Sequence, residues 1–467
     1  MNGGRINHEN ITENQSVYEL EPLLMINHKR FDIMAKYIYG VFLENNINST
    51  WGYRLYEDHI WVFNNYDEDD NSGKKGIKSF FDSFNGILKS VKENGFIDDV
   101  SIIPINKDYV PIDGAHRLAA ALLYNKKVKV TRLDNSLVNY NYEFFKRKGL
   151  LIKWSDAMAY EYCKLNKNTF VILLSPFAIK EIDLVKESLN KLGSIYYEKY
   201  IDLENNGPIN LASQLNKLKN KLNIECPLNI IEGTFCVLLF EAKHCENISR
   251  IYGELIKIYE DEKNSFYIND NHAVTVQLAQ LFLNENSLHY LNNAIPGMSE
   301  KLKSTIKHFK TYLNAEKNDA ECFCVISDAV LDVYGIREFN ELSFIQSHSN
   351  IKNFKVEDIK KYTEKNLILK IPIDDIIFNP ENHFYYDGIK FCSLKTLKKI
   401  KRKQNLNIDN EGLKLAEHLV KKNINQNIVM YRYRITKELK IIKLKIIEQK
   451  LKYKRWFISI FKIRGGE

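Results

Sequence analysis

The sequence is poor in glycine and proline, with 20 and 9 of them in 467 residues, and no uncharged apolar run is long enough to cross a bilayer. The N-terminus has no apolar signal region, so we expect a cytoplasmic protein or one on the inner face of a membrane. The seven cysteines are odd in number and form no Cys-x-x-Cys pair. Neither a disulfide framework nor a zinc site is therefore expected, and the thiols are expected to be free in a reducing compartment.

Most of the chain also lacks an excess of basic charge. The formal net charge is +8, but residues 431–467 alone hold 12 Lys and Arg against 3 Asp and Glu. The rest of the chain holds 55 basic and 56 acidic side chains, a balance that is not typical of a nucleic-acid-binding surface. At this length, and with 45% hydrophobic residues, two or three domains with well-filled cores are expected.

The most informative stretch is the pentapeptide Asp113-Gly114-Ala115-His116-Arg117, called here the 113–117 turn. A short apolar strand precedes it, and a helix rich in Ala and Leu follows at once. Gly114 permits a tight turn, and the first N–H groups of a helix attract anions. Arg117 adds a planar guanidinium that can hold a phosphate through two hydrogen bonds. The same pattern also fits a plain strand-to-helix turn, in which Asp113 caps the helix and His116 and Arg117 are solvated.

The segments around the 113–117 turn have a recognisable order. Residues 77–94 carry apolar side chains at helical spacing before Gly95, and strands are predicted at 100–105 and 127–131. With Asp-Gly-x-His-Arg at this place, residues 50–135 resemble the ParB N-terminal and sulfiredoxin superfamily. The resemblance implies a bound nucleotide, ATP or CTP, with phosphates near Gly114, His116 and Arg117. Sulfiredoxins place a cysteine where this chain has Ala115, so sulfinic acid reduction is not expected.

Members of this superfamily include kinases that act on free serine, in which an upstream glutamate serves as base. Here an acidic run at 66–71 precedes the first long helix, and Glu68 is the candidate base, followed by Asp69 and Glu57. Phosphoryl transfer usually needs Mg²⁺, which Asp113 could reach. An acidic loop before a helix also favours the helix dipole, so simple solvation of Glu68 remains open.

The first domain is predicted to cover residues 1–137 and to include a helical N-terminal extension. A helix is predicted at 30–44 because Phe31, Met34, Ala35, Ile38 and Phe42 share one face. The aromatic-rich residues 50–63 are predicted to form a pair of strands.

A central α/β domain is predicted at 138–300. Helices are expected at 154–164 and 179–192, and strands at 169–174, 194–197 and 234–240. Before a further helix, Asp270 or Asn271 can act as N-cap, or Asp270 and His272 can point into a site together with His289. Their spacing matches no common set of metal ligands, so capping is favoured.

Residues 301–430 are predicted to form a third domain. A strand ending in Ser327 and Asp328, a short helix and a second strand at 342–345 resemble the nucleotidyltransferase fold of the polymerase-β type. Basic residues at 395–403 before Asp409 add to the resemblance. In that fold an Asp-x-Asp strand holds two metal ions, whereas this chain has Glu341-Leu-Ser at the equivalent place. Active nucleotidyl transfer at Ser327 and Glu341 is therefore disfavoured.

Residues 431–464 are predicted to form one basic amphipathic helix. The apolar stripe consists of Ile435, Leu439, Ile442, Ile446, Tyr453, Trp456 or Phe457, and Ile460. Such a helix suits an anionic membrane surface. Docking on the protein's own core, a coiled coil and binding to nucleic-acid phosphates remain alternatives, the last being the least favoured.

Taken together, these patterns predict an α+β or α/β multidomain protein. Most of the chain also resembles large proteins of bacterial capsule and surface-polysaccharide clusters, through segments such as 268–272 and 334–337. The leading hypothesis is a nucleotide-binding phosphotransferase, similar to a kinase, that acts on a small-molecule or sugar acceptor in polysaccharide assembly. The alternatives are a ParB-like regulator whose nucleotide controls binding of DNA or a partner, and a nucleotidyltransferase.

Overall fold

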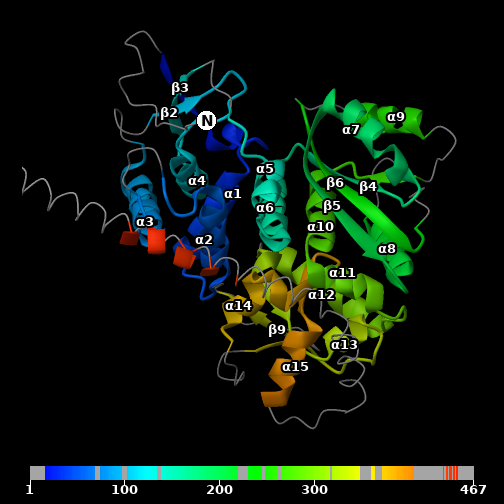
Figure 1. The fold of residues 1–467 in the computed structure, drawn as a ribbon. Coiled ribbons are helices and arrows are strands. Elements are labelled where there is room, and N and C mark those ends of the chain that lie inside the picture. The colour runs from blue at the N-terminus through cyan, green and yellow to red at the C-terminus, as the bar shows by residue number, and fades with distance from the viewer. Residues whose placement is uncertain are drawn as a thin grey trace, which may run out of the picture. The chain divides into compact units, whose positions relative to one another are not determined.

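The computed structural model describes residues 16–68, 74–96, 102–133, 138–218, 230–243, 248–259, 265–315, 318–347, 359–362, 371–403 and single positions between 435 and 450. These residues form a mixed α/β structure with three open sheets (Figure 1). Residues up to Asn407 belong to one compact unit, and Ile408–Glu467 belong to a second. Within the first unit, one sheet falls in each of the ranges 1–137, 138–300 and 301–430.

The first sheet has the strand order β1-β3-β2, in which β3 is antiparallel to β1 and parallel to β2. Helix α4 connects β2 to β3, so the 113–117 turn lies in a βαβ unit. Helices α1, α3 and α4 pack on one another, and residues Ala119 to Ala121 of α4 are fully buried. The bounds are β1 Val17–Leu20, η2 Pro22–Met25, α1 Asp32–Glu44, α2 Trp51–Asn64, α3 Ile77–Asn94, β2 Ile103–Ile105, α4 Ala115–Tyr124 and β3 Val128–Arg132.

Most of the predicted elements of this region are confirmed. Helix α3 has the predicted bounds and ends at Gly95, whose φ of 67° is the left-handed conformation that glycine tolerates. Strands β2 and β3 fall within or next to the predicted stretches, although residues 97–101 lie outside the described part of the chain. Helix α1 matches the predicted helix at 30–44, whereas strand β1 was not predicted.

The predicted pair of strands at 50–63 is wrong, because these residues form the single helix α2. Aromatic residues are common in strands, and this preference suggested the wrong element. The spacing decides otherwise: Trp51, Leu55 and His59 recur every four residues, and all three are buried. The ring of Trp51 packs 4.4 Å from that of Trp154, so tertiary contacts fix the helical face.

The central sheet has the strand order β5-β6-β4-β7, and every neighbouring pair is antiparallel. Helices α7 and α9 cover one face with a continuous apolar core, and α10 packs on β4 beside α6 (Figure 1). The predicted strands and helices are confirmed, β5 being longer than expected. The bounds are α5 Tyr142–Lys148, α6 Ile152–Leu165, β4 Thr169–Leu174, η4 Ala178–Glu181, α7 Ile182–Asn190, β5 Gly193–Leu203, α8 Gly207–Lys217, β6 Gly233–Ala242, α9 Ile248–Ile258, β7 Phe266–Ile268, α10 His272–Phe282 and α11 Glu285–Asn293.

The third sheet is mixed, with the strand order β10-β9-β8-β12-β11. Strands β11 and β12 form a hairpin whose turn residues, Asp387 and Gly388, both have positive φ, as tight hairpin turns require. The predicted strand, helix and strand between Cys322 and Ile345 are confirmed as β8, α13 and β9. The bounds are α12 Glu300–Ala315, η5 Ala320–Cys322, β8 Phe323–Val325, α13 Ala329–Val333, β9 Leu342–Gln346, β10 Ile359–Lys361, α14 Ile373–Phe378, η7 Pro380–Asn382, β11 His383–Tyr386, β12 Ile389–Cys392 and α15 Leu394–Lys403.

Candidate functional site

Gly114 shapes the 113–117 turn. It precedes the first residue of α4 and has a φ of 79°, which residues with a side chain rarely adopt. A Cβ atom at this position would lie 3.1 Å from Nη2 of Arg117 and 3.2 Å from Cγ1 of Ile103. The turn therefore needs glycine both for its backbone conformation and for the approach of Arg117.

Arg117 lies beside the turn and is only partly open to solvent. Its Nη1 donates a hydrogen bond of 3.1 Å to the carbonyl oxygen of Ile102, and its Nη2 lies 3.7 Å from Oδ2 of Asp113. The side chains of Arg117 and Asp113 are 23% and 45% exposed. The guanidinium therefore lies over Gly114 and remains partly accessible to solvent.

His116 is held as a neutral imidazole. Its Nε2 lies 2.8 Å from the hydroxyl of Tyr56, and its ring packs 4.7 Å from that of Phe84. Burial, together with the positive charges of Lys36 and Lys74, lowers the pKa of His116 well below its usual value. In this state His116 can accept or donate a hydrogen bond, but it does not add charge to the turn.

A buried ion network of Arg30, Asp32 and Lys36 contacts the chain just before the turn, at Pro111. Arg30 donates two hydrogen bonds to the carboxylate of Asp32, at 2.9 and 3.0 Å, and a third to the carbonyl oxygen of Pro111. Lys36 donates to the same carboxylate at 2.9 Å. Arg30, Asp32 and Lys36 are 4%, 1% and 3% exposed. Burial alone would raise the pKa of Asp32, but Arg30 and Lys36 outweigh this and hold it well below its usual range.

Sequence reasoning missed this network, although one signal was present. Asp32 and Lys36 are four residues apart, the spacing of an ion pair on one helical face. The same spacing is common on exposed helix faces, so only the apolar residues around it, such as Phe31 and Ile33, indicated burial.

His59 on α2 lies close to this network. It is fully buried, and neither of its ring nitrogens has a hydrogen-bond partner. Its ring packs against those of Phe63 and Phe145. Burial and the charge of Lys36 lower its pKa well below the usual value, so it is neutral.

The predicted base, Glu68, is paired with Lys74, because its Oε2 forms an ion pair of 2.8 Å with Nζ of that residue. The charge of Lys74 acts on His116, and that of Glu68 acts on Tyr56, the hydrogen-bond partner of His116. Glu68 and Lys74 are thus linked electrostatically to the surroundings of His116, although they are distant from it in sequence.

The other two candidates for the base are Glu57 and Asp69. Oε1 of Glu57 accepts a hydrogen bond of 3.4 Å from the hydroxyl of Tyr66. Asp69 lies outside the described residues.

Asp270 and His272 have structural partners in the central region. Asn271, between them, is the N-cap of α10 and accepts a hydrogen bond from the N–H of Val274. Asp270 accepts from the side-chain amide of Asn271, and Nε2 of His272 lies 2.8 Å from the carbonyl oxygen of Cys163. His289 lies 3.0 Å from the hydroxyl of Tyr334. Among the described residues, no group of three or more His, Cys, Asp or Glu could hold a metal ion.

In the third region, Asp328 is paired with two basic side chains. Its carboxylate forms ion pairs with Arg337 and with Lys401 of α15. Ser327 accepts a hydrogen bond of 3.1 Å from the N–H of Ser343, and Glu341 accepts one of 3.3 Å from the hydroxyl of Ser343. Asp328 is thus held by two cations, and Glu341 by the hydroxyl of Ser343, in the part of the chain that the structure describes. Asp409 lies outside the described residues.

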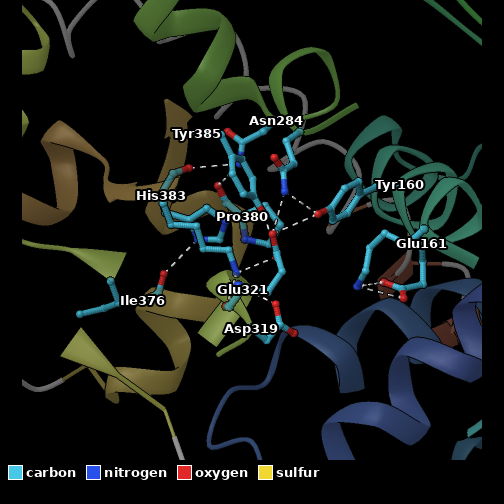
Figure 2. Close-up of polar contacts among 12 residues, drawn as sticks. Tyr160, Glu161, Asn284, Asp319, Glu321, Ile376, Pro380, His383 and Tyr385 are labelled. Atoms are coloured by element: carbon cyan, nitrogen blue, oxygen red, sulfur yellow. Dashed lines mark hydrogen bonds and ion pairs between the residues drawn. The ribbon is translucent and has the colours of Figure 1, made fainter. Parts of the chain in front are cut away.

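A second polar cluster surrounds Glu321 and was not predicted from the sequence (Figure 2). Its carboxylate accepts hydrogen bonds from Tyr160 and Gln280 at 3.1 and 2.8 Å, and from Tyr385 at 3.0 Å. Nζ of Lys390 lies 2.9 Å from the same carboxylate. Burial alone would raise the pKa of Glu321, but Lys390 and Lys164 outweigh it and lower it to about 2. Because every oxygen has a partner, this cluster joins α6, α10 and the third sheet rather than offering a reactive group.

Comparison of the chain with protein-family models, with curated proteins and with solved structures finds no match. Of the candidate residues, those at the 113–117 turn combine a glycine-dependent backbone turn with a partly exposed guanidinium and a hydrogen bond from the buried Arg30 to Pro111.

Proposed function

We propose that the protein is a nucleotide-dependent phosphotransferase that receives the nucleotide phosphates at the 113–117 turn. The observation that carries the proposal is the buried pair of cations behind the turn. Arg30 and Lys36 share the carboxylate of Asp32 in a buried network, and Asp113 and Glu68 are further carboxylates whose charges act on Arg30 and on Lys36. Buried cations are stabilised by nearby anions, and a phosphate at the turn would add one.

The residues of the turn have separate roles in this proposal. Arg117 exchanges its hydrogen bond to the carbonyl oxygen of Ile102 for bonds to a phosphate, and neutral His116 adds a further hydrogen bond. Asp113 supplies the carboxylate of the turn, is 45% exposed and suits Mg²⁺, which typically takes one or two carboxylates besides phosphate oxygens. When bound, Mg²⁺ neutralises charge on the phosphates.

Glu68 is proposed as the base for the acceptor hydroxyl. The acceptor oxygen forms a bond to the terminal phosphorus, the bond to the leaving nucleoside diphosphate breaks, and the hydroxyl proton passes to Glu68. Its ion pair with Lys74, whose charge acts on His116, supports this assignment. The resemblance to surface-polysaccharide proteins suggests a sugar or another small molecule as acceptor.

A ParB-like regulator is the second candidate. The contact that favours it is the ion pair between Glu68 and Lys74, because Lys74 occupies Oε2 of Glu68 and competes with an acceptor hydroxyl for it. In this case the nucleotide is bound at the turn and is not consumed. Nucleotidyl transfer at Ser327 and Glu341 is a weaker proposal, because Asp328 is already paired with Arg337 and Lys401.

Thermal-shift measurements with ATP and CTP, with and without Mg²⁺, test the site. We expect one of these nucleotides to raise the unfolding midpoint and Arg117→Ala to abolish the shift. Arg147→Ala is the matched control, because Arg147 is an exposed arginine on the neighbouring helix α5. An equal shift in the Arg117→Ala protein would show that the nucleotide binds elsewhere.

Glu68→Gln separates the two candidate functions. A kinase loses nucleotide turnover with this change but keeps the thermal shift, because the base acts on the acceptor and not on nucleotide binding. A regulator shows the same shift with either residue and no turnover in the wild type. Loss of the shift itself would instead place Glu68 in the nucleotide site.

A further inference from the structure

The C-terminal basic helix exposes an apolar stripe. Among its described positions, Ile435, Leu439, Ile442 and Ile446 follow one another at intervals of four, three and four residues, which places them on one helical face. Their exposed fractions are 39%, 61%, 52% and 48%. These four side chains therefore lie on one helical face and are exposed to water. Tyr453, Trp456, Phe457 and Ile460, which the sequence adds to the stripe, lie outside the described residues.

Positive charge surrounds this stripe. Lys443, Lys445 and Lys450 are exposed on the same helix. The sequence of residues 431–467 contains 12 basic and 3 acidic side chains, whereas the rest of the chain is nearly balanced in charge. The helix thus combines two features, an apolar face and a local positive charge, and any partner has to satisfy both.

Three kinds of partner can be compared on these two features. A second copy of the helix could bury the stripe as a coiled coil, but it would bring two strongly basic segments together with few carboxylates to pair them. A nucleic acid would neutralise the lysines and leave the stripe in water. An anionic lipid surface buries the stripe at the boundary between headgroups and acyl chains and attracts the lysines to the headgroups.

We propose that this helix binds the protein to an anionic bilayer surface, lying in the interface without crossing it. Among the described residues, no helix is long and apolar enough to span a membrane, so an interfacial position is the mode that this helix offers. The proposal concerns where the protein acts and does not depend on nucleotide binding at the 113–117 turn.

Vesicle flotation of the full-length protein tests the proposal. The probes are vesicles of phosphatidylcholine alone and of phosphatidylcholine mixed with phosphatidylglycerol. We expect at least about tenfold stronger partitioning to the anionic vesicles, and weaker partitioning at high salt because the charges are screened.

Two sets of variants separate the contributions of the stripe and of the lysines. Leu439→Ser with Ile442→Ser is expected to reduce partitioning about tenfold or more, because the buried apolar area is lost. The matched control is Leu184→Ser, which removes an apolar side chain of similar exposure, 52%, from helix α7 of the other unit. Lys443→Gln with Lys450→Gln is expected to reduce partitioning to anionic vesicles only.

Several results would overturn the proposal. They are equal binding to neutral and anionic vesicles, unchanged partitioning of the Leu439→Ser, Ile442→Ser protein, and failure of the wild-type protein to float. A dimer in sedimentation equilibrium that the same two substitutions dissociate, without vesicle binding, would assign the stripe to a second copy. Retention on DNA without flotation would assign the helix to nucleic acid.

Discussion

The guanidinium of Arg30 donates a hydrogen bond of 2.5 Å to the carbonyl oxygen of Pro111, across 81 residues of sequence. Pro111 lies two residues before Asp113, so this contact fixes the chain as it enters the 113–117 turn. The same guanidinium binds Asp32 through two nitrogens and packs on the ring of Tyr140. The orientation of the turn therefore depends on a charged group that is itself almost entirely buried.

Replacement of Asp32 is expected to destabilise the protein strongly. Asp32→Asn removes the carboxylate that Arg30 and Lys36 share and leaves both buried cations without this partner, at a cost of about 3–5 kcal/mol in the free energy of unfolding. Urea unfolding monitored by circular dichroism measures this loss. Asp82→Asn, at an exposed position on α3, is the control and should change stability by less than about 0.5 kcal/mol. Similar stabilities for the two variants would mean that the ion network contributes little.

Gly114→Ala is expected to disturb the turn. The new Cβ would require a positive φ and would approach Arg117 and Ile103, so we expect a loss of about 1–2 kcal/mol and a weaker nucleotide-dependent thermal shift. Gly86→Ala on helix α3 is the matched control, since a Cβ there meets no atom within 4 Å. Alanine favours helices, so this control should stabilise the protein by about 0.5–1 kcal/mol. A stabilising Gly114→Ala substitution would contradict the described turn.

Glu321 is expected to contribute to acid sensitivity. Its pKa is lowered to about 2 from 4.5, so the ionised group stabilises the folded state above pH 4.5, and this stability is lost as the pH falls from 4.5 towards 2. Thermal unfolding midpoints measured across this range should fall with acidification. Glu321→Gln should flatten the part of the pH dependence that comes from this group. An unchanged profile in the variant would show that Glu321 is not paired as described.

Asp156 is expected to have the opposite effect. Burial raises its pKa to about 6 against the opposing charge of Lys199, so the folded state binds a proton that the unfolded state releases near pH 3.8. The stabilisation of the folded state by this bound proton is present at low pH and is lost as the pH rises from 3.8 to 6. Asp156→Asn should remove this component from a plot of unfolding midpoint against pH. A midpoint that rises equally over this range in both proteins would exclude a raised pKa for Asp156.

Local periodicity predicted much of the fold. The helix at 77–94 and the strand at 169–174 have the predicted bounds, because apolar spacing and punctuation by Gly95 or Pro176 agree with the tertiary structure. The strands predicted at 50–63 were wrong, because helix–helix packing overrides the preference of aromatic side chains for strands. The hairpin of β11 and β12 was also missed, although Asp387-Gly388 is a typical hairpin signal.

The candidate site was predicted only in part. Asp113, Gly114 and Arg117 form one local motif, and short sequence patterns reveal such motifs. Arg30 bonds the carbonyl oxygen of Pro111 across 81 residues of sequence, beside the packing of α1 on α4, and no local pattern encodes that contact. The Glu321 cluster was missed for the same reason, since its partners come from α6, α10 and the third sheet.

The most direct measurement is a crystal structure of the protein with Mg²⁺ and a non-hydrolysable ATP or CTP analogue. We predict phosphate oxygens within hydrogen-bonding distance of the backbone N–H groups at the start of α4, with the guanidinium of Arg117 released from the carbonyl oxygen of Ile102 and bound to phosphate. Phosphates located elsewhere, with Arg117 still over Gly114 and bonded to Ile102, would contradict the account.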